Sequence, residues 1–205
     1  MMVKAPGRLV VFEGVDAVGK TSLCNDLCQS LEEMHLPHQR VHFPGKDSGT
    51  LGELIYQIHH RQFDMPSVDP CTLQLLHIAA HVDIIETTIK QSVAKGDWVV
   101  LDRFWWSTYV YGLDSGVGQE SLELMIEIEK NAWEDLVPDV LLLVDAESPL
   151  RDDEANCAAW HRKRELYHQV LDREQDQYCC VVIQTTEGEE ARRHASGIIL
   201  REVLR

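Results

Sequence analysis

The sequence lacks long apolar runs and is short of positive charge. No apolar stretch approaches the roughly 20 residues that a membrane-spanning helix needs, so we expect no membrane partner. Lysine and arginine number 19 against 34 aspartates and glutamates, for a formal net charge of −15. This balance argues against nucleic acid as a partner. Residues 1–7 lead straight into an apolar strand pattern, so we expect no signal peptide and a cytoplasmic protein.

Sequence signatures of zinc sites, disulfide frameworks and guanine binding are also missing. The six cysteines include no C-x-x-C pair, and the ten histidines include no H-E-x-x-H. We therefore expect reduced thiols and no zinc site. No N-K-x-D motif for guanine occurs, which argues against a GTPase.

What the chain does have is an alternation of strand and helix patterns over 205 residues, enough for one domain. The alternation predicts an α/β fold, a five-stranded parallel sheet with helices on both faces. We expect strands at 8–13, 39–43, 98–102, 139–145 and 179–184. We expect helices at 20–34, 49–61, 69–95, 119–135, 158–174 and 188–204. A short, acidic, polar stretch over 147–159 predicts a loop.

The strongest motif is Gly14–Thr21, which fits G-x-x-x-x-G-K-[ST] between an apolar strand pattern and a helical one. Glycines allow a tight turn, and the helix N-terminus adds positive charge toward bound phosphates. Lys20 is expected to reach the β- and γ-phosphates and Thr21 to bind Mg²⁺. A glycine-rich turn that binds nothing is the alternative. The residues expected around the nucleotide are Gly14, Val15, Ala17, Val18, Gly19, Lys20, Thr21 and Ser22.

A second motif, Asp102-Arg103, follows the apolar strand at 98–102. Ligands of such sheets bind beyond the carboxyl ends of the strands. Asp102 is therefore placed to orient Mg²⁺ or its waters, and Arg103 offers a fork of donors to a phosphate. A surface ion pair that caps the strand is the alternative.

Several segments together closely resemble the thymidylate kinase family: Phe12-Glu13-Gly14 with Asp16 in the loop, Phe43-Pro44, and Asp102-Arg103-Phe104 with Ser107. The resemblance covers most of the chain. It implies transfer of a phosphoryl group from MgATP to the 5′-phosphate of dTMP or a related deoxypyrimidine monophosphate, in nucleotide biosynthesis. It also implies a five-stranded parallel sheet, a lid at about 147–160 and a homodimer.

The resemblance also implies roles for residues at matching positions. Asp16 would face the sugar 3′-hydroxyl and the reacting phosphates, Tyr111 would crowd the 2′ carbon, and Arg151 would pack on adenine. The residues expected to be catalytic are Lys20, Asp16, Arg103 and Asp102, with Thr21 and Asp102 at the metal. The residues expected to bind the acceptor are Asp16, Phe43, Lys46, His77, His81, Arg103, Ser107 and Tyr111.

The sequence departs from the family pattern at the acceptor pocket and the lid. Lys46 stands where an arginine is usual, His77 where a phenylalanine stacks on the base, and His81 where another arginine is usual. The phosphate loop has no arginine at its variable positions, so a cation for the transferred group must come from elsewhere. The candidates are Arg151, Arg162 and Arg164, whereas Lys163 is expected on a solvated helix face.

These departures leave two alternatives open. The histidines and Lys46 suit a related deoxynucleotide or deoxynucleoside kinase with another acceptor. The short lid suits a nucleotide-binding protein with little catalysis.

Overall fold

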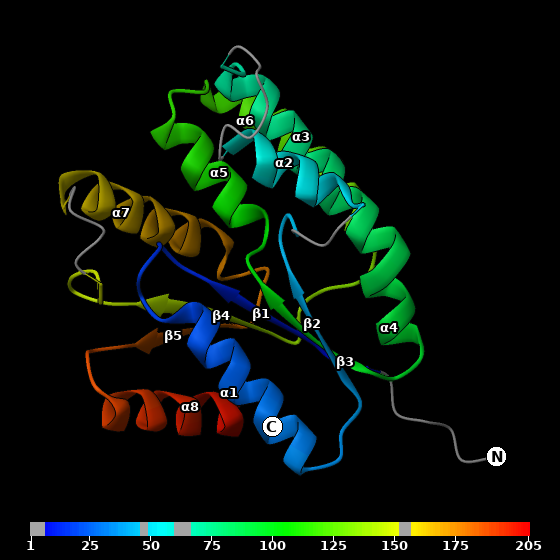
Figure 1. The fold of residues 1–205 in the computed structure, drawn as a ribbon, viewed down its shortest axis with the longest axis vertical. Coiled ribbons are helices and arrows are strands. Elements are labelled where there is room, and N and C mark those ends of the chain that lie inside the picture. Colours follow the sequence, from blue (N-terminus) through cyan, green and yellow to red (C-terminus); the bar gives the residue numbers. More distant parts are fainter. Residues whose placement is uncertain (1–6, 46–48, 60–66, 152–156) are drawn as a thin grey trace.

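The computed structural model describes residues 7–45, 49–59, 67–151 and 157–205. Its centre is a sheet of five parallel strands in the order β2-β3-β1-β4-β5 (Figure 1). The strands are β1 (Leu9–Glu13), β2 (His38–His42), β3 (Trp98–Asp102), β4 (Val140–Asp145) and β5 (Cys180–Gln184). The predicted sheet is confirmed. The three central strands are almost entirely buried, as expected of parallel strands covered on both faces.

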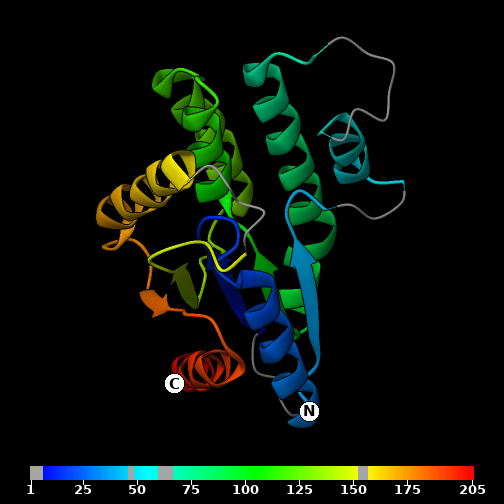
Figure 2. The ribbon, with the colours of Figure 1, turned by 60° about the vertical axis from the view of Figure 1, so that its left-hand side comes forward.

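Helices cover both faces of this sheet (Figures 1 and 2). On one face α1 (Lys20–Glu33) packs beside α8 (Glu189–Val203). The opposite face carries the remaining helices. They are α2 (Leu51–His59), α3 (Pro70–Ile84), α4 (Lys90–Ala94), α5 (Trp105–Asp114), α6 (Gln119–Trp133) and α7 (Cys157–Glu174). Within the described residues, no helix has the length and apolar character required to cross a membrane.

The predicted helix over 69–95 is continuous but not uniform. Asp69 caps its start, because the side chain accepts from the N–H groups of Cys71 and Thr72 at 2.9 and 3.2 Å, and Pro70 occupies the first turn. A π-helical turn over Ile85–Ile89 separates α3 from α4.

Helix α5 is absent from the sequence prediction, which placed nothing regular between 102 and 119. Its segment Trp105–Val110 is buried on every side, so no polar face marks it as an amphipathic helix. This helix positions Ser107 and Tyr111, and its omission was the main error in the predicted fold.

Candidate active site

The loop between β1 and α1 has a backbone that requires glycine at its two ends. Gly14 has φ of 134°, and a Cβ there would lie 2.2 Å from the carbonyl oxygen of Val144. Gly19 has φ of 87° and precedes Lys20, the first residue of α1. The Lys20 ammonium donates to Val15 O at 2.6 Å, and burial together with the charge of Arg103 lowers the pKa of Lys20 to about 8.

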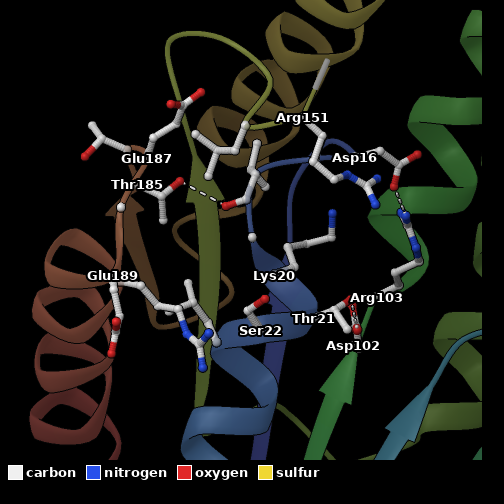
Figure 3. A pocket seen from close by; sticks show the side chains of 18 of the residues that line it. Asp16, Lys20, Thr21, Ser22, Asp102, Arg103, Arg151, Thr185, Glu187 and Glu189 are labelled. Carbon is white, nitrogen blue, oxygen red and sulfur yellow. Dashed lines mark hydrogen bonds and ion pairs between the residues drawn. The ribbon is translucent and has the colours of Figure 1, made fainter. Parts of the chain in front are cut away.

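A cavity of about 640 Å³ opens over this loop and the start of α1 (Figure 3). Its lining contains the expected nucleotide residues Ala17, Val18, Gly19, Lys20, Thr21, Ser22 and Arg151, but neither Gly14 nor Val15. Thr185 closes the cavity on the β5 side, and its hydroxyl donates to Val18 O at 2.9 Å. We call this space the donor cavity.

Asp102 lies at the foot of the donor cavity and is almost fully buried. Its Oδ2 accepts from the Thr21 hydroxyl at 3.0 Å and from Arg40 at 3.1 Å, with His42 Nδ1 at 3.4 Å. Its Oδ1 is buried and has no hydrogen-bond partner among the described residues. Burial alone would raise the pKa of Asp102, but His42 and the charges of Lys20 and Arg103 hold it well below the usual range.

Arg103 and Tyr111 both contact the carboxylate of Asp16. Arg103 follows β3 in a left-handed conformation, with φ of 79°, and its N–H donates to Phe12 O at 2.9 Å. Its guanidinium pairs with Asp16 Oδ1, and the Tyr111 hydroxyl donates to Asp16 Oδ2 at 2.5 Å. Burial opposes ionisation, but Arg103 and Lys20 lower the pKa of Asp16 to about 2. The carboxylate is therefore ionised at neutral pH.

A buried carboxylate that we did not predict as a site residue, Glu13, joins the phosphate loop to α5. Its Oε1 accepts from the N–H groups of Phe104 and Ser107 at 2.7 and 2.9 Å, and its Oε2 accepts from the Ser107 hydroxyl at 2.8 Å. The Tyr167 hydroxyl of α7 lies 2.8 Å from the same Ser107 oxygen. Burial raises the pKa of Glu13. A single glutamate ending an apolar strand was the sequence signal for it.

A second cavity of about 530 Å³ lies on the other side of Arg103, and we call it the acceptor cavity. It brings together most of the residues expected to bind the acceptor: Asp16, Phe43, His77, His81, Arg103, Ser107 and Tyr111. Lys46, also expected there, lies outside the described residues. Gln74 and Thr108 line the cavity too and were not predicted.

The two cavities share Asp16, His42 and Arg103. Two ligands, one in each cavity, would therefore meet beside the carboxylate of Asp16 and the guanidinium of Arg103, which already form an ion pair.

The three arginines that are candidates for binding the transferred phosphoryl group lie in different places. Arg164 makes a two-pronged ion pair with Asp145, at 2.6 and 2.7 Å, and Arg162 binds Asp114 at 2.9 Å. Arg151 lines the donor cavity, and Figure 3 shows its side chain pointing inward on the side of Asp16 and Lys20. Residues 152–156 of the predicted lid lie outside the described residues.

The expectation for Lys163 was wrong. Its side chain is half-buried, and its ammonium lies 4.8 Å from the centre of the Tyr111 ring. At that distance a cation is attracted to the face of the ring. Lys163 therefore adds a positive charge beside the acceptor cavity, which the helical pattern of α7 did not reveal.

The parallel sheet, the glycine-rich loop after β1 and the paired cavities define a P-loop protein of the nucleoside monophosphate kinase type. The family model for thymidylate kinase matches residues 12–191. This chain belongs to the thymidylate kinase family.

Similar proteins agree with this membership. The thymidylate kinase of Ruthia magnifica subsp. Calyptogena magnifica is 34% identical over 140 residues, 68% of this chain and 65% of that protein. The thymidylate kinase of Ureaplasma parvum serovar 3 is 30% identical over 142 residues, 68% of this chain and 60% of that protein. The alignment thus spans less than two thirds of these relatives.

A solved structure of thymidylate kinase from Ehrlichia chaffeensis has a similar fold. The TM-score is 0.75 at 21% identity, and the alignment covers 98% of this chain and all of the other. This likeness confirms the fold class.

Proposed function

We propose that this protein transfers the γ-phosphoryl group of ATP to the 5′-phosphate of dTMP or a related deoxypyrimidine monophosphate. The products are ADP and the deoxynucleoside diphosphate. The observation that carries the proposal is the junction of the two cavities at Asp16 and Arg103. Membership of the thymidylate kinase family supports the choice of donor and acceptor.

In this reaction the site positions the two substrates and stabilises charge, because phosphoryl transfer requires little covalent chemistry from the protein. Lys20 neutralises the donor's β- and γ-phosphates, and Arg103 holds the acceptor phosphate in line. Ionised Asp16 orients the acceptor's sugar and keeps Arg103 in place. Arg151 supplies the cation for the transferred group, which its inward direction in Figure 3 supports.

The residues at the foot of the donor cavity fit Mg²⁺. The ion prefers oxygen ligands, and Asp102 and Thr21 present a carboxylate and a hydroxyl there. The buried Oδ1 of Asp102, which has no hydrogen-bond partner among the described residues, is a further free oxygen. When bound, the ion would neutralise charge on the donor's phosphates.

Tyr111 supports a deoxyribose acceptor. Its ring lines the acceptor cavity beside Asp16, where the family resemblance puts the sugar's 2′ carbon. Phe43 and His77 line the same cavity and suit a planar base.

We also propose a cytoplasmic homodimer. Leu75 on α3 and Leu124 and Ile128 on α6 are large apolar side chains left exposed in the single chain. Sedimentation equilibrium gives the mass in solution, and a monomer at micromolar concentration contradicts this part of the proposal.

One assay tests the proposed reaction against its rivals: ADP release from MgATP with a panel of acceptors. The panel holds dTMP, dUMP, dCMP, UMP and thymidine, with Lys20→Ala as background. Release that requires a deoxypyrimidine monophosphate supports the proposal. Release with thymidine alone indicates a deoxynucleoside kinase, and no release with any acceptor indicates a binding protein.

A further inference from the structure

A buried histidine–glutamate pair forms part of the wall of the acceptor cavity. His81 comes from α3 and Glu129 from α6, and Nδ1 of the histidine lies 2.8 Å from Oε2 of the glutamate. Their side chains are 3% and 0% exposed. The other oxygen of Glu129 has no hydrogen-bond partner among the described residues. Within the described residues, His81 is thus the hydrogen-bond partner of this buried carboxyl group.

The protons carried by Glu129 and His81 determine whether Nε2 faces the cavity as a hydrogen-bond donor or as an acceptor. An unneutralised charge costs several kcal/mol in a buried site, so the pair is most stable with no net charge. Three proton arrangements satisfy that condition: a carboxylate with an imidazolium, a carboxylic acid that donates from Oε2 to Nδ1 of a neutral imidazole, and a carboxylic acid protonated on Oε1 whose Oε2 accepts from Nδ1–H. The third arrangement is disfavoured, because Oε1 has no hydrogen-bond partner among the described residues and its O–H would be buried without an acceptor. In the other two arrangements Nε2 of His81 carries a hydrogen. Glu129 therefore makes Nε2 a hydrogen-bond donor.

The surroundings of His81 favour the same state. Its ring stacks on Phe43, with centroids 4.0 Å apart and planes at 13°, and the face of an aromatic ring attracts a cation. Nδ1 is turned to α6, so Nε2 lies on the other side of the ring, and His81 lines the acceptor cavity. Within the described part of the chain, Nδ1 makes the hydrogen bond of this ring and Nε2 makes none.

We propose that Glu129 is a positioning residue that makes His81 select the acceptor's base. It holds Nε2 of His81 as a donor, which pairs with a carbonyl oxygen on the edge of the base and rejects an amino group at the same place. The inference rests on the proposed function, since it needs the acceptor's base to occupy this cavity. A polar mismatch of this kind costs about tenfold or more in affinity.

Glu129→Gln is the direct test, because it keeps the shape of the side chain and removes its charge. A glutamine can accept from Nδ1–H or donate to Nδ1, so the neutral imidazole can present Nε2 either as a donor or as an acceptor. The matched control is Glu127→Gln, which changes an exposed glutamate on the same helix. Circular dichroism and thermal unfolding show whether each variant is folded.

The matched ligands are dUMP and dCMP, which differ at two neighbouring positions of the base edge. Uracil has a carbonyl oxygen beside N3–H, and cytosine has an amino group beside an unprotonated N3. Calorimetry measures both affinities, and steady-state kinetics measures kcat and KM. We expect the native protein and Glu127→Gln to prefer dUMP, and Glu129→Gln to reduce that preference at least tenfold. The loss should appear in KM, with kcat changed less than threefold. An unchanged preference in Glu129→Gln, or a loss confined to kcat, overturns the proposal.

A measurement on the native protein needs neither the variant nor turnover. Nitrogen-15 labelling of histidine, with His81→Gln to assign the signal, reports by chemical shift whether Nε2 of His81 is protonated at pH 7.5. A protonated Nε2 supports the proposal and a bare Nε2 overturns it. If no acceptor is phosphorylated, the proposed function fails, while the affinity ratio and this spectrum still decide the role of Glu129.

Discussion

The hydroxyl of Tyr111 donates to Oδ2 of Asp16 at 2.5 Å, while Arg103 pairs with the other oxygen of the same carboxylate. Arg103 precedes α5 and Tyr111 belongs to it, so both side chains hold Asp16, a residue of the phosphate loop, in place. Burial raises the pKa of Tyr111, so its hydroxyl remains a donor across the physiological pH range. The orientation of Asp16 therefore depends on Tyr111 as well as on Arg103.

Tyr111→Phe removes this hydrogen bond and keeps the ring. A hydrogen bond to a charged group contributes about 1.5–3 kcal/mol, so we expect kcat/KM for the acceptor to fall about 10–100-fold. The preference for dUMP over UMP should persist in this variant and shrink in Tyr111→Ala, which opens space at the 2′ carbon. Steady-state kinetics with both nucleotides checks this. Equal use of UMP and dUMP by the native protein would refute the role given to Tyr111.

Arg103→Ala tests whether the junction of the cavities serves the acceptor. Loss of one preorganised cation from the reacting phosphates should lower kcat/KM for the acceptor about 10²–10³-fold. ATP affinity should change less than threefold, because Lys20 and the loop hold the donor. Arg192→Ala, at the far side of the donor cavity, is the control. If Arg103→Ala keeps native kcat/KM, its pairing with Asp16 is only structural.

Lys20 gives ATP binding a pH dependence with a definite sign. Its pKa is about 8 in the empty site, and bound phosphates favour the charged ammonium. ATP affinity should therefore fall as pH rises from 7 to 10, and binding at pH 8 should take up about half a proton. Calorimetry in buffers of different ionisation enthalpy measures this uptake. Lys20→Arg, which stays charged, should show none; equal proton uptake in both proteins would exclude Lys20 as its source.

The hydrogen bonds that Glu13 accepts predict that its substitution lowers the stability of the fold. Glu13→Gln places an amide N–H₂ group among the N–H and O–H donors of Phe104 and Ser107. We expect the free energy of unfolding to fall by about 2–3 kcal/mol, from urea denaturation. Glu32→Gln, at an exposed position of α1, should change it by less than 0.5 kcal/mol. A stability equal to native would mean that the glutamine satisfies the same donors.

The sequence was sufficient where a local pattern determines the structure. Each of the five strands lies within two residues of its predicted position. The three central strands are the clearest, because a parallel strand buried on both faces is a continuous apolar run. The glycine-rich loop was equally clear. Helix α5 was missed because its N-terminus is capped by Glu13, some 90 residues away in the sequence, and not by a neighbouring side chain.

Contacts between side chains on helices that are distant in the sequence could not be predicted for the same reason. Glu129 lies among charged residues of α6 and looks solvated, yet it is fully buried against His81. Lys163 sits in a basic stretch of α7 and nevertheless reaches Tyr111. Which member of a charged run turns inward is decided by the packing of two helices, and no local spacing encodes that contact.

The central claim is that a phosphoryl group passes between the two cavities at Asp16 and Arg103. The most direct test supplies ATP labelled at its γ-phosphate together with Mg²⁺ and dTMP, and separates the products by chromatography. We predict that the label appears in dTDP, in a one-to-one ratio with ADP, and that Lys20→Ala and Arg103→Ala lose the transfer. Label found only in inorganic phosphate, or left in ATP with every deoxypyrimidine monophosphate, would contradict the claim.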